Sequence, residues 1–238
     1  MADNYSRSYK SVNEATTINP VATLMQKVYL WMTLALCASG LTALGAVSSE
    51  TMMSLILGSR TAFFLLIIAE LGVVFYLNIA IRKISFKTAA ALFMVYSILN
   101  GATLSVIFLV YQLPSIISTF FITAGTFGAM AWLGHTTKKD LSSIGQMLSM
   151  ALIGLIIASI VNIFWANNVL YWITTYVGVF IFVGLTAYDA QKIKNMLNKR
   201  NQHNSEEIRK IALIGSLMLY LDFVNLFLYL LRLFGKKK

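Results

Sequence analysis

The chain has 238 residues, of which 58% are hydrophobic and 12% are charged, and its mean hydropathy is +0.73. A soluble domain carries about 25% charged residues, so this composition excludes an ordinary soluble protein and indicates a membrane protein. Most of the 19 Lys and Arg residues fall in the N-terminal segment and in the connections on its side of the bilayer. This bias predicts a cytoplasmic N-terminus. The net charge of +10 is therefore explained by basic residues that orient the protein in the membrane and contact anionic lipid headgroups, and it does not indicate binding to nucleic acid.

Seven apolar runs, each about 19–23 residues long, suffice to cross about 30 Å of hydrocarbon as helices. The predicted spans cover residues 28–47, 61–81, 88–110, 115–133, 144–165, 168–189 and 211–231. We expect helices because the runs lack the alternation of barrel strands, and because every backbone group must be hydrogen-bonded inside the bilayer. The predicted fold class is an all-α membrane protein, with a cytoplasmic N-terminal segment (1–27), no cleaved signal, and a seven-helix transmembrane domain (28–238).

The connections differ in length. Those at 111–114 and 166–167 are short and predict helical hairpins, whereas residues 191–210 are polar and should extend both flanking helices beyond the bilayer. Within them, Asn204 and Glu207 have the spacing of a helix N-cap. The basic tail RLFGKKK lies on the non-cytoplasmic side in a seven-span arrangement, so either the other loops outweigh it or the last helix does not fully cross.

Three carboxylates, Glu70, Asp189 and Asp222, lie within the spans or at their ends. A charge in mid-bilayer costs about 3 kcal/mol, so such a group usually faces the bundle interior and either pairs or titrates. Asp222 is central in the last span and shares its helix face with Gly215 and Tyr229. This helix therefore belongs inside a bundle.

Asp189 and Asp222 lie on consecutive antiparallel helices, and they reach equal depth if the intervening turn centres near Ser205. Two carboxyl groups in contact share one proton and titrate as a unit. Loss of that proton leaves two like charges, which either separate the helices or recruit a hard cation such as Ca²⁺. The alternative is that each aspartate only hydrogen-bonds locally and holds the bundle together.

Two arginines are candidate partners for these carboxylates. Arg232, at the outer end of the last span, is predicted to form a structural ion pair with Glu70, and a contribution to a gate is the alternative. Arg82 ends the second span on the side of Asp189, where it is either a latch for that carboxylate or an ordinary positive-inside residue. His135 is expected to be a solvated loop residue.

Two stretches near the C-terminus resemble the closing motifs of the Bax inhibitor-1 family, especially its bacterial members: GLTAYDAQKIKNM (184–196) and LYLDFVNLFLYLLRLFG (219–235). The resemblance runs from about residue 20 to the end. It implies a seven-helix bundle whose last helix is central and wrapped by two three-helix layers, in the inner (plasma) membrane of a bacterium.

The resemblance also implies a pH-sensitive calcium leak, with Asp189 and Asp222 as gate and pH sensor. The same two residues would be transient ligands of the permeant Ca²⁺, and no tightly bound cofactor is implied. Glu70 and Arg232 match a carboxylate and an arginine of the family, and Arg82 matches its latch arginine approximately.

Other functions were weighed against a leak. An intramembrane aspartyl protease pairs Tyr-Asp with Gly-x-Gly-Asp, whereas the second aspartate here lies in Tyr220-Leu221-Asp222. The predicted spans contain no histidine for a serine or zinc protease, so no enzyme is predicted. The main alternative, implied by bacterial relatives, is a non-transporting regulator that binds a membrane-bound protease or another partner.

Overall fold

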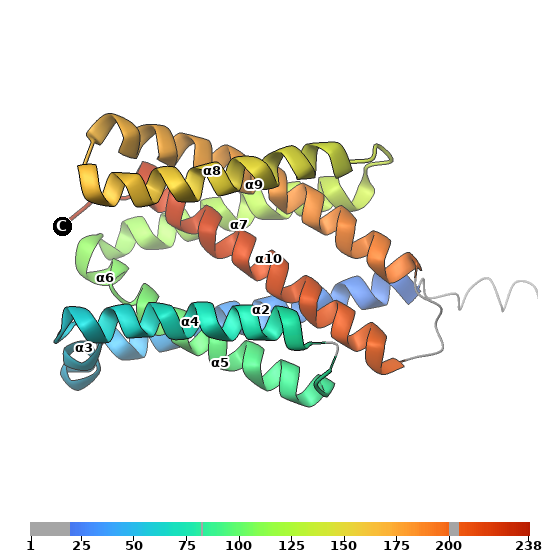
Figure 1. Ribbon diagram of the computed structural model, residues 1–238, viewed down its shortest axis with the longest axis horizontal. Helices are drawn as coiled ribbons and strands as arrows, with labels where there is room; N and C mark the ends of the chain where they lie inside the picture. Colours follow the sequence, from blue (N-terminus) through green and yellow to red (C-terminus); the bar gives the residue numbers. More distant parts are fainter. Residues whose placement is uncertain (1–19, 82, 200–204) are drawn as a thin grey trace, which may run out of the picture.

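The computed structural model describes residues 20–81, 83–199 and 205–238, which form a bundle of long helices (Figure 1). The helices are α2 (Pro20–Val47), α3 (Glu50–Leu57), α4 (Arg60–Ala80), α5 (Phe86–Leu104), α6 (Ile107–Val110), α7 (Leu113–Thr136), α8 (Ser142–Trp165), α9 (Asn168–Lys199) and α10 (Ser205–Phe234). Seven segments are long and apolar enough to span a membrane, with α5 and α6 together forming one of them. The predicted all-α fold with seven spans is confirmed.

Local chemistry sets several helix ends. Serine hydroxyls accept hydrogen bonds from the first turns of three helices: Ser49 from the Met52 N–H, Ser59 from the Ala62 N–H, and Ser85 from the Thr88 N–H. Each bond satisfies one of the backbone donors that a helix start leaves unpaired. The predicted hairpin between α8 and α9 turns at Ala166, which adopts a left-handed φ of 43°, and the Asn167 carboxamide accepts from the first N–H groups of α9.

The last helix is the most buried of the seven. In its most apolar stretch 67% of the residues are buried, against 6% in α8. α10 packs on α9, α2, α7 and α5. It crosses between two groups of helices: α7, α8 and α9 form one group, and α2, α4 and α5 form the other (Figure 1). The wrapping of α10 by two three-helix layers stays a prediction, since α4 packs chiefly on α5 and α8 chiefly on α9.

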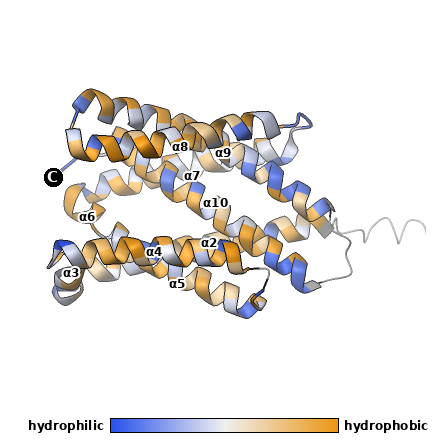
Figure 2. Cartoon of the chain, viewed as in Figure 1, coloured by the Kyte–Doolittle hydropathy of each residue, from blue (hydrophilic) through white to orange (hydrophobic). Residues whose placement is uncertain are grey.

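Hydrophobic residues dominate the helices between the two ends of the bundle, and hydrophilic residues gather where α9 ends and α10 begins (Figure 2). Phe75, Ile79 and Phe164 are 64%, 78% and 81% exposed. Large exposed apolar patches of this kind need an apolar solvent, so this surface faces hydrocarbon.

The helices extend beyond the predicted spans at the polar end. α2 begins at Pro20 rather than Val28, α9 continues to Lys199, and α10 begins at Ser205. The extension of both helices into the polar 191–210 connection is confirmed. Asn204, the predicted N-cap, and Arg82 lie outside the described residues.

The basic tail lies at the far end of the bundle from the start of α2 (Figure 1). Its backbone pairs with the start of α7: the Gln112 N–H donates to the Lys236 carbonyl oxygen at 3.0 Å, and the Lys238 N–H donates to the Val110 carbonyl oxygen at 3.0 Å. The last helix therefore crosses the whole bundle, which answers the question that the tail sequence raised.

Gly134 marks the close approach of α7 to α9. A Cβ atom there would overlap the Ala187 carbonyl oxygen, which is backbone and has no flexible end that can yield. We expect Gly134→Ala to lower the free energy of unfolding by about 1–3 kcal/mol, as overpacking does. Thermal unfolding in detergent measures this effect. Gly128→Ala on the same helix, where no atom lies within 4 Å, is the matched control; equal melting temperatures for both variants would contradict the prediction.

Candidate functional site

Asp189 of α9 and Asp222 of α10 meet inside the bundle, where their carboxyl groups lie within hydrogen-bonding reach of each other. Asp222 is 5% exposed and Asp189 is half-buried. The second oxygen of Asp222, Oδ2, is enclosed and has no hydrogen-bond partner among the described residues. The structure thus brings together the two carboxylates whose meeting the sequence left open.

Small residues let α9 and α10 approach closely. Gly178 of α9 lies against the ring of Tyr229, which also stacks on Phe182 at a centroid distance of 5.7 Å. On the other side of the carboxyl pair, Gly215 of α10 lies against Ile193. The glycines make room for larger side chains of the facing helix, which sets the spacing at which the carboxyl groups touch.

Among the described residues, Lys192 places a positive charge beside the pair. Lys192 follows Asp189 by one helical turn, and its charge acts on both carboxyl groups. Its Nζ also lies 5.4 Å from the centre of the Tyr188 ring. A hydrogen bond between two carboxyl groups requires a proton on one of them, so the paired state carries a single negative charge that Lys192 partly offsets.

Glu70 belongs to a second polar cluster. It accepts a hydrogen bond from Thr103 and contacts Asn100, both on the neighbouring α5, and it is 8% exposed. Arg232 is exposed and lies over the rings of Tyr171 and Tyr229, at 5.6 Å and 5.4 Å.

The predicted Glu70–Arg232 ion pair is therefore not formed between these two described residues. The physical reason is that hydroxyl and amide groups on α5 already satisfy the Glu70 carboxylate, while aromatic faces hold the guanidinium.

The sequence analysis missed Tyr220, which extends the Glu70 cluster through α10. This fully buried residue bonds through its hydroxyl to Ser39 Oγ at 2.7 Å and to Asn100 Oδ1 at 3.0 Å. Ser39 Oγ also lies 2.7 Å from the Ser97 carbonyl oxygen. Polar residues inside three apolar spans were the available signal, but only the packing of α2, α5 and α10 brings them together.

His135 differs from its predicted solvated state. It lies in the last turn of α7, half-buried, and its Nδ1 is enclosed without a hydrogen-bond partner in the described part of the chain. The reason is that α7 continues to Thr136, so that packing surrounds the ring.

The described residues contain no group of three or more His, Cys, Asp and Glu side chains that would hold a metal ion. The aspartate pair offers at most four carboxylate oxygens, whereas Ca²⁺ takes about six to eight oxygen ligands. This oxygen set fits brief contact with a passing hydrated cation better than a closed, resident calcium site.

Comparison with known proteins gives a match over nearly the whole chain. Residues 21–238 match a family model described as "Inhibitor of apoptosis-promoting Bax1". The inner membrane protein YbhL of Escherichia coli K12 is 49% identical over 216 residues, which cover 91% of this chain and 92% of that protein. A protein of Borreliella burgdorferi is 44% identical over 214 residues (90% and 92%), and protein RP147 of Rickettsia prowazekii is 41% identical over 215 residues (90% and 89%).

Removing the Tyr220 hydroxyl tests the second cluster. We expect Tyr220→Phe to lower the free energy of unfolding by about 1–3 kcal/mol, because Ser39 and Asn100 then lose a buried partner. Thermal unfolding in detergent is the measurement. The same change at Tyr76, which is 55% exposed, should cost less than about 0.5 kcal/mol. If both changes cost the same, the hydroxyl bonds do not stabilise the bundle.

Proposed function

Because this chain belongs to the Bax inhibitor-1 family of membrane proteins, we propose that it is a pH-sensitive calcium leak gated by the Asp189/Asp222 carboxyl pair. The observation that carries the proposal is that the carboxyl groups of α9 and α10 lie within hydrogen-bonding reach of each other inside the bundle. We place the protein in the inner membrane, as YbhL is by its name, with the start of α2 on the cytoplasmic side, as the distribution of basic residues predicts.

The shared proton is the element that makes the pair sensitive to pH. With one proton, the carboxyl groups hold α9 and α10 together through a charge-assisted hydrogen bond. Without it, two like charges about 4 Å apart repel by about 4 kcal/mol at an effective dielectric constant of about 20. This repulsion exceeds the roughly 1.5–3 kcal/mol that a hydrogen bond to a charged group contributes, so a change in the protonation state of the pair is large enough to shift the two helices.

A shift of α10 would reach beyond the pair. Tyr220 lies two residues before Asp222 on the same helix and joins the cluster of Ser39, Asn100 and Glu70 on the other side. The proposed path for Ca²⁺ runs beside α10, where oxygen atoms of these buried side chains interrupt the hydrocarbon interior. Ca²⁺ is the proposed cargo, since carboxylate, amide and hydroxyl oxygens are the ligands it prefers.

Calcium flux into liposomes that contain the purified protein tests the proposal across about pH 5–8. We expect the flux of the parent protein to depend on pH, and Asp222→Asn or Asp189→Asn to abolish the flux or make it insensitive to pH. The physical reason is that a carboxamide donates the hydrogen bond that the shared proton supplies, and it does not titrate.

Asp140→Asn is the matched control, because Asp140 is an exposed loop carboxylate whose Oδ1 accepts from the Ser142 N–H. This variant should keep the pH response of the parent. Flux absent at every pH, or unchanged by both pair substitutions, would overturn the gate and favour the partner-binding regulator. For such a regulator, deletion of residues 1–20 should impair function more than the neutralisation of either aspartate does.

A further inference from the structure

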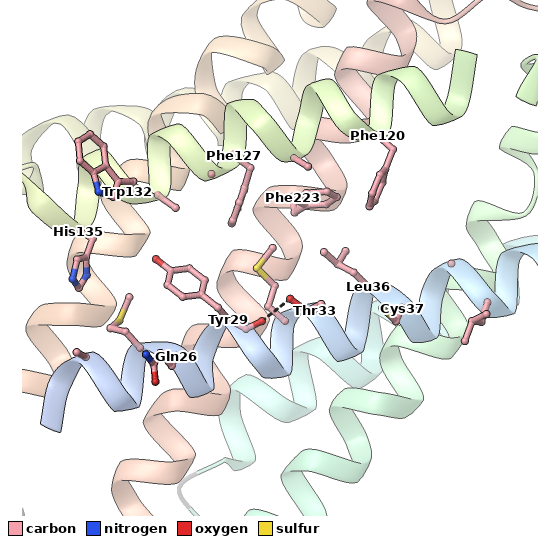
Figure 3. A pocket seen from close by; sticks show the side chains of 18 of the residues that line it. Gln26, Tyr29, Thr33, Leu36, Cys37, Phe120, Phe127, Trp132, His135 and Phe223 are labelled. Carbon is pink, nitrogen blue, oxygen red and sulfur yellow. Dashed lines mark hydrogen bonds between the residues drawn. The ribbon is translucent and has the colours of Figure 1, made fainter. Parts of the chain in front are cut away.

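An open cavity of 960 Å³ lies between α2 and α7, and Phe223 of α10 closes its inner side (Figure 3). A second cavity of 420 Å³ continues it, since both are lined by Leu36, Gly40, Phe120 and Phe223. α2 and α7 are not among the principal helix contacts of the described chain. The two cavities together form one groove, here called the α2–α7 groove, on a surface that faces hydrocarbon.

The groove is long and mostly apolar. Its α2 wall runs from Ala22 to Leu44, which is about 33 Å at 1.5 Å per residue. This is longer than one leaflet of the hydrocarbon layer, which is about 15 Å deep. Leucine, methionine, phenylalanine, alanine and glycine side chains form most of the wall. An acyl chain spans about one leaflet, so it fits within this length, and its apolar chemistry matches that of the wall.

One end of the groove is polar. Gln26, Tyr29 and His135 line it at the start of α2 and the end of α7, where Figure 3 shows Tyr29 and His135 directed into the space between the helices. His135 Nδ1 is enclosed there without a hydrogen-bond partner among the described residues. Trp132 is 70% exposed on the same stretch, and exposed tryptophans mark the headgroup level of a bilayer.

Lysines lie next to this polar end, around a neighbouring pocket that is lined by Lys138, Lys139 and Lys194. Lys194 of α9 donates from Nζ to the His135 carbonyl oxygen at 2.7 Å, and its charge acts on the imidazole. Lys138 and Lys139 follow α7 in the next turn of chain. Asp140, a carboxylate in the same turn of chain, is engaged with the backbone and hydroxyl of Ser142. The end of the groove therefore suits an anion at headgroup level.

We propose that the α2–α7 groove binds one anionic phospholipid, with an acyl chain along the groove and the phosphate beside His135 and Lys194. The ammonium group of Lys194 and the imidazole of His135 donate to phosphate oxygens. The apolar wall takes the acyl chain, and Phe223 of α10 lies beneath it. This inference does not depend on calcium transport.

Native mass spectrometry of the detergent-purified chain, after addition of phosphatidylglycerol or phosphatidylcholine, tests the proposal. We expect one phosphatidylglycerol to be retained per chain, about fivefold more tightly than phosphatidylcholine, as one lysine near an anionic headgroup provides. His135→Ala or Lys194→Gln should remove most of this preference. Equal retention of the two lipids by the parent would overturn the headgroup assignment.

Glycines supply matched variants for the apolar wall. Gly40 on α2 and Gly128 on α7 line the groove, and no atom lies within 4 Å of a Cβ built on either. Gly40→Leu and Gly128→Leu should fill the groove and lower lipid retention at least about tenfold. Gly45 and Gly125 are equally open but are not among the lining residues, so Gly45→Leu and Gly125→Leu should retain lipid as the parent does.

The native Cys37 allows a second measurement of groove occupancy, because no cysteine has to be introduced. It is the only cysteine of the chain, is exposed, and lines the groove. Added phosphatidylglycerol should slow its alkylation by N-ethylmaleimide in the parent and in Gly125→Leu. Retention that is equal in Gly128→Leu and Gly125→Leu, with no protection of Cys37, would overturn the lipid site. If the spectra instead show a dimer of the chain, and Gly128→Leu abolishes that dimer, the groove binds a second copy of the chain and not a lipid.

Discussion

Hydrocarbon cannot hydrogen-bond, so every polar side chain of the buried α10 must find its partner inside the protein, and the rest of the bundle is arranged around that requirement. Ser216 donates to the Val28 carbonyl oxygen of α2 at 2.9 Å. Tyr220 bonds to α2 and α5, and Asp222 pairs with Asp189 of α9. In a bilayer, apolar contacts between helices do little to favour one packing arrangement over another, because the lipid tails are as apolar as the side chains. These bonds to three neighbours therefore fix the rotation and depth of α10.

The polar contacts of α10 separate into two sites with different chemistry. On the α9 side, two carboxyl groups face each other, and a single proton decides whether they attract or repel. On the α2 and α5 side, hydroxyl and amide groups surround Tyr220 and lead to Glu70 without another charge in contact. The first site is suited to respond to pH, and the second to hold the bundle together. Because one helix carries both, a displacement of α10 at the first site would be transmitted to the second.

The same arrangement accounts for the groove. α10 contacts both α2 and α7, and the space between these two helices beside Phe223 stays open. Phe223 follows Asp222 directly and packs edge-on against Phe120 and Phe127, at 5.6 Å and 5.4 Å. An occupant of the groove would thus touch the residue next to the carboxyl pair. Lipid composition and proton concentration would then act on neighbouring positions of one helix.

The sequence by itself determined the class of the protein, the seven spans and the carboxylate shortlist. Length and apolarity suffice for a span, and a charge within one is rare enough to stand out. Tertiary structure alone decided which groups pair. It joined Glu70 to Thr103 rather than to Arg232, gathered Tyr220, Ser39 and Asn100 from three helices, and enclosed His135. Periodicity shows which face of a helix is polar, but crossing angles and helix ends determine which face it meets, and these arise only when all the helices pack together.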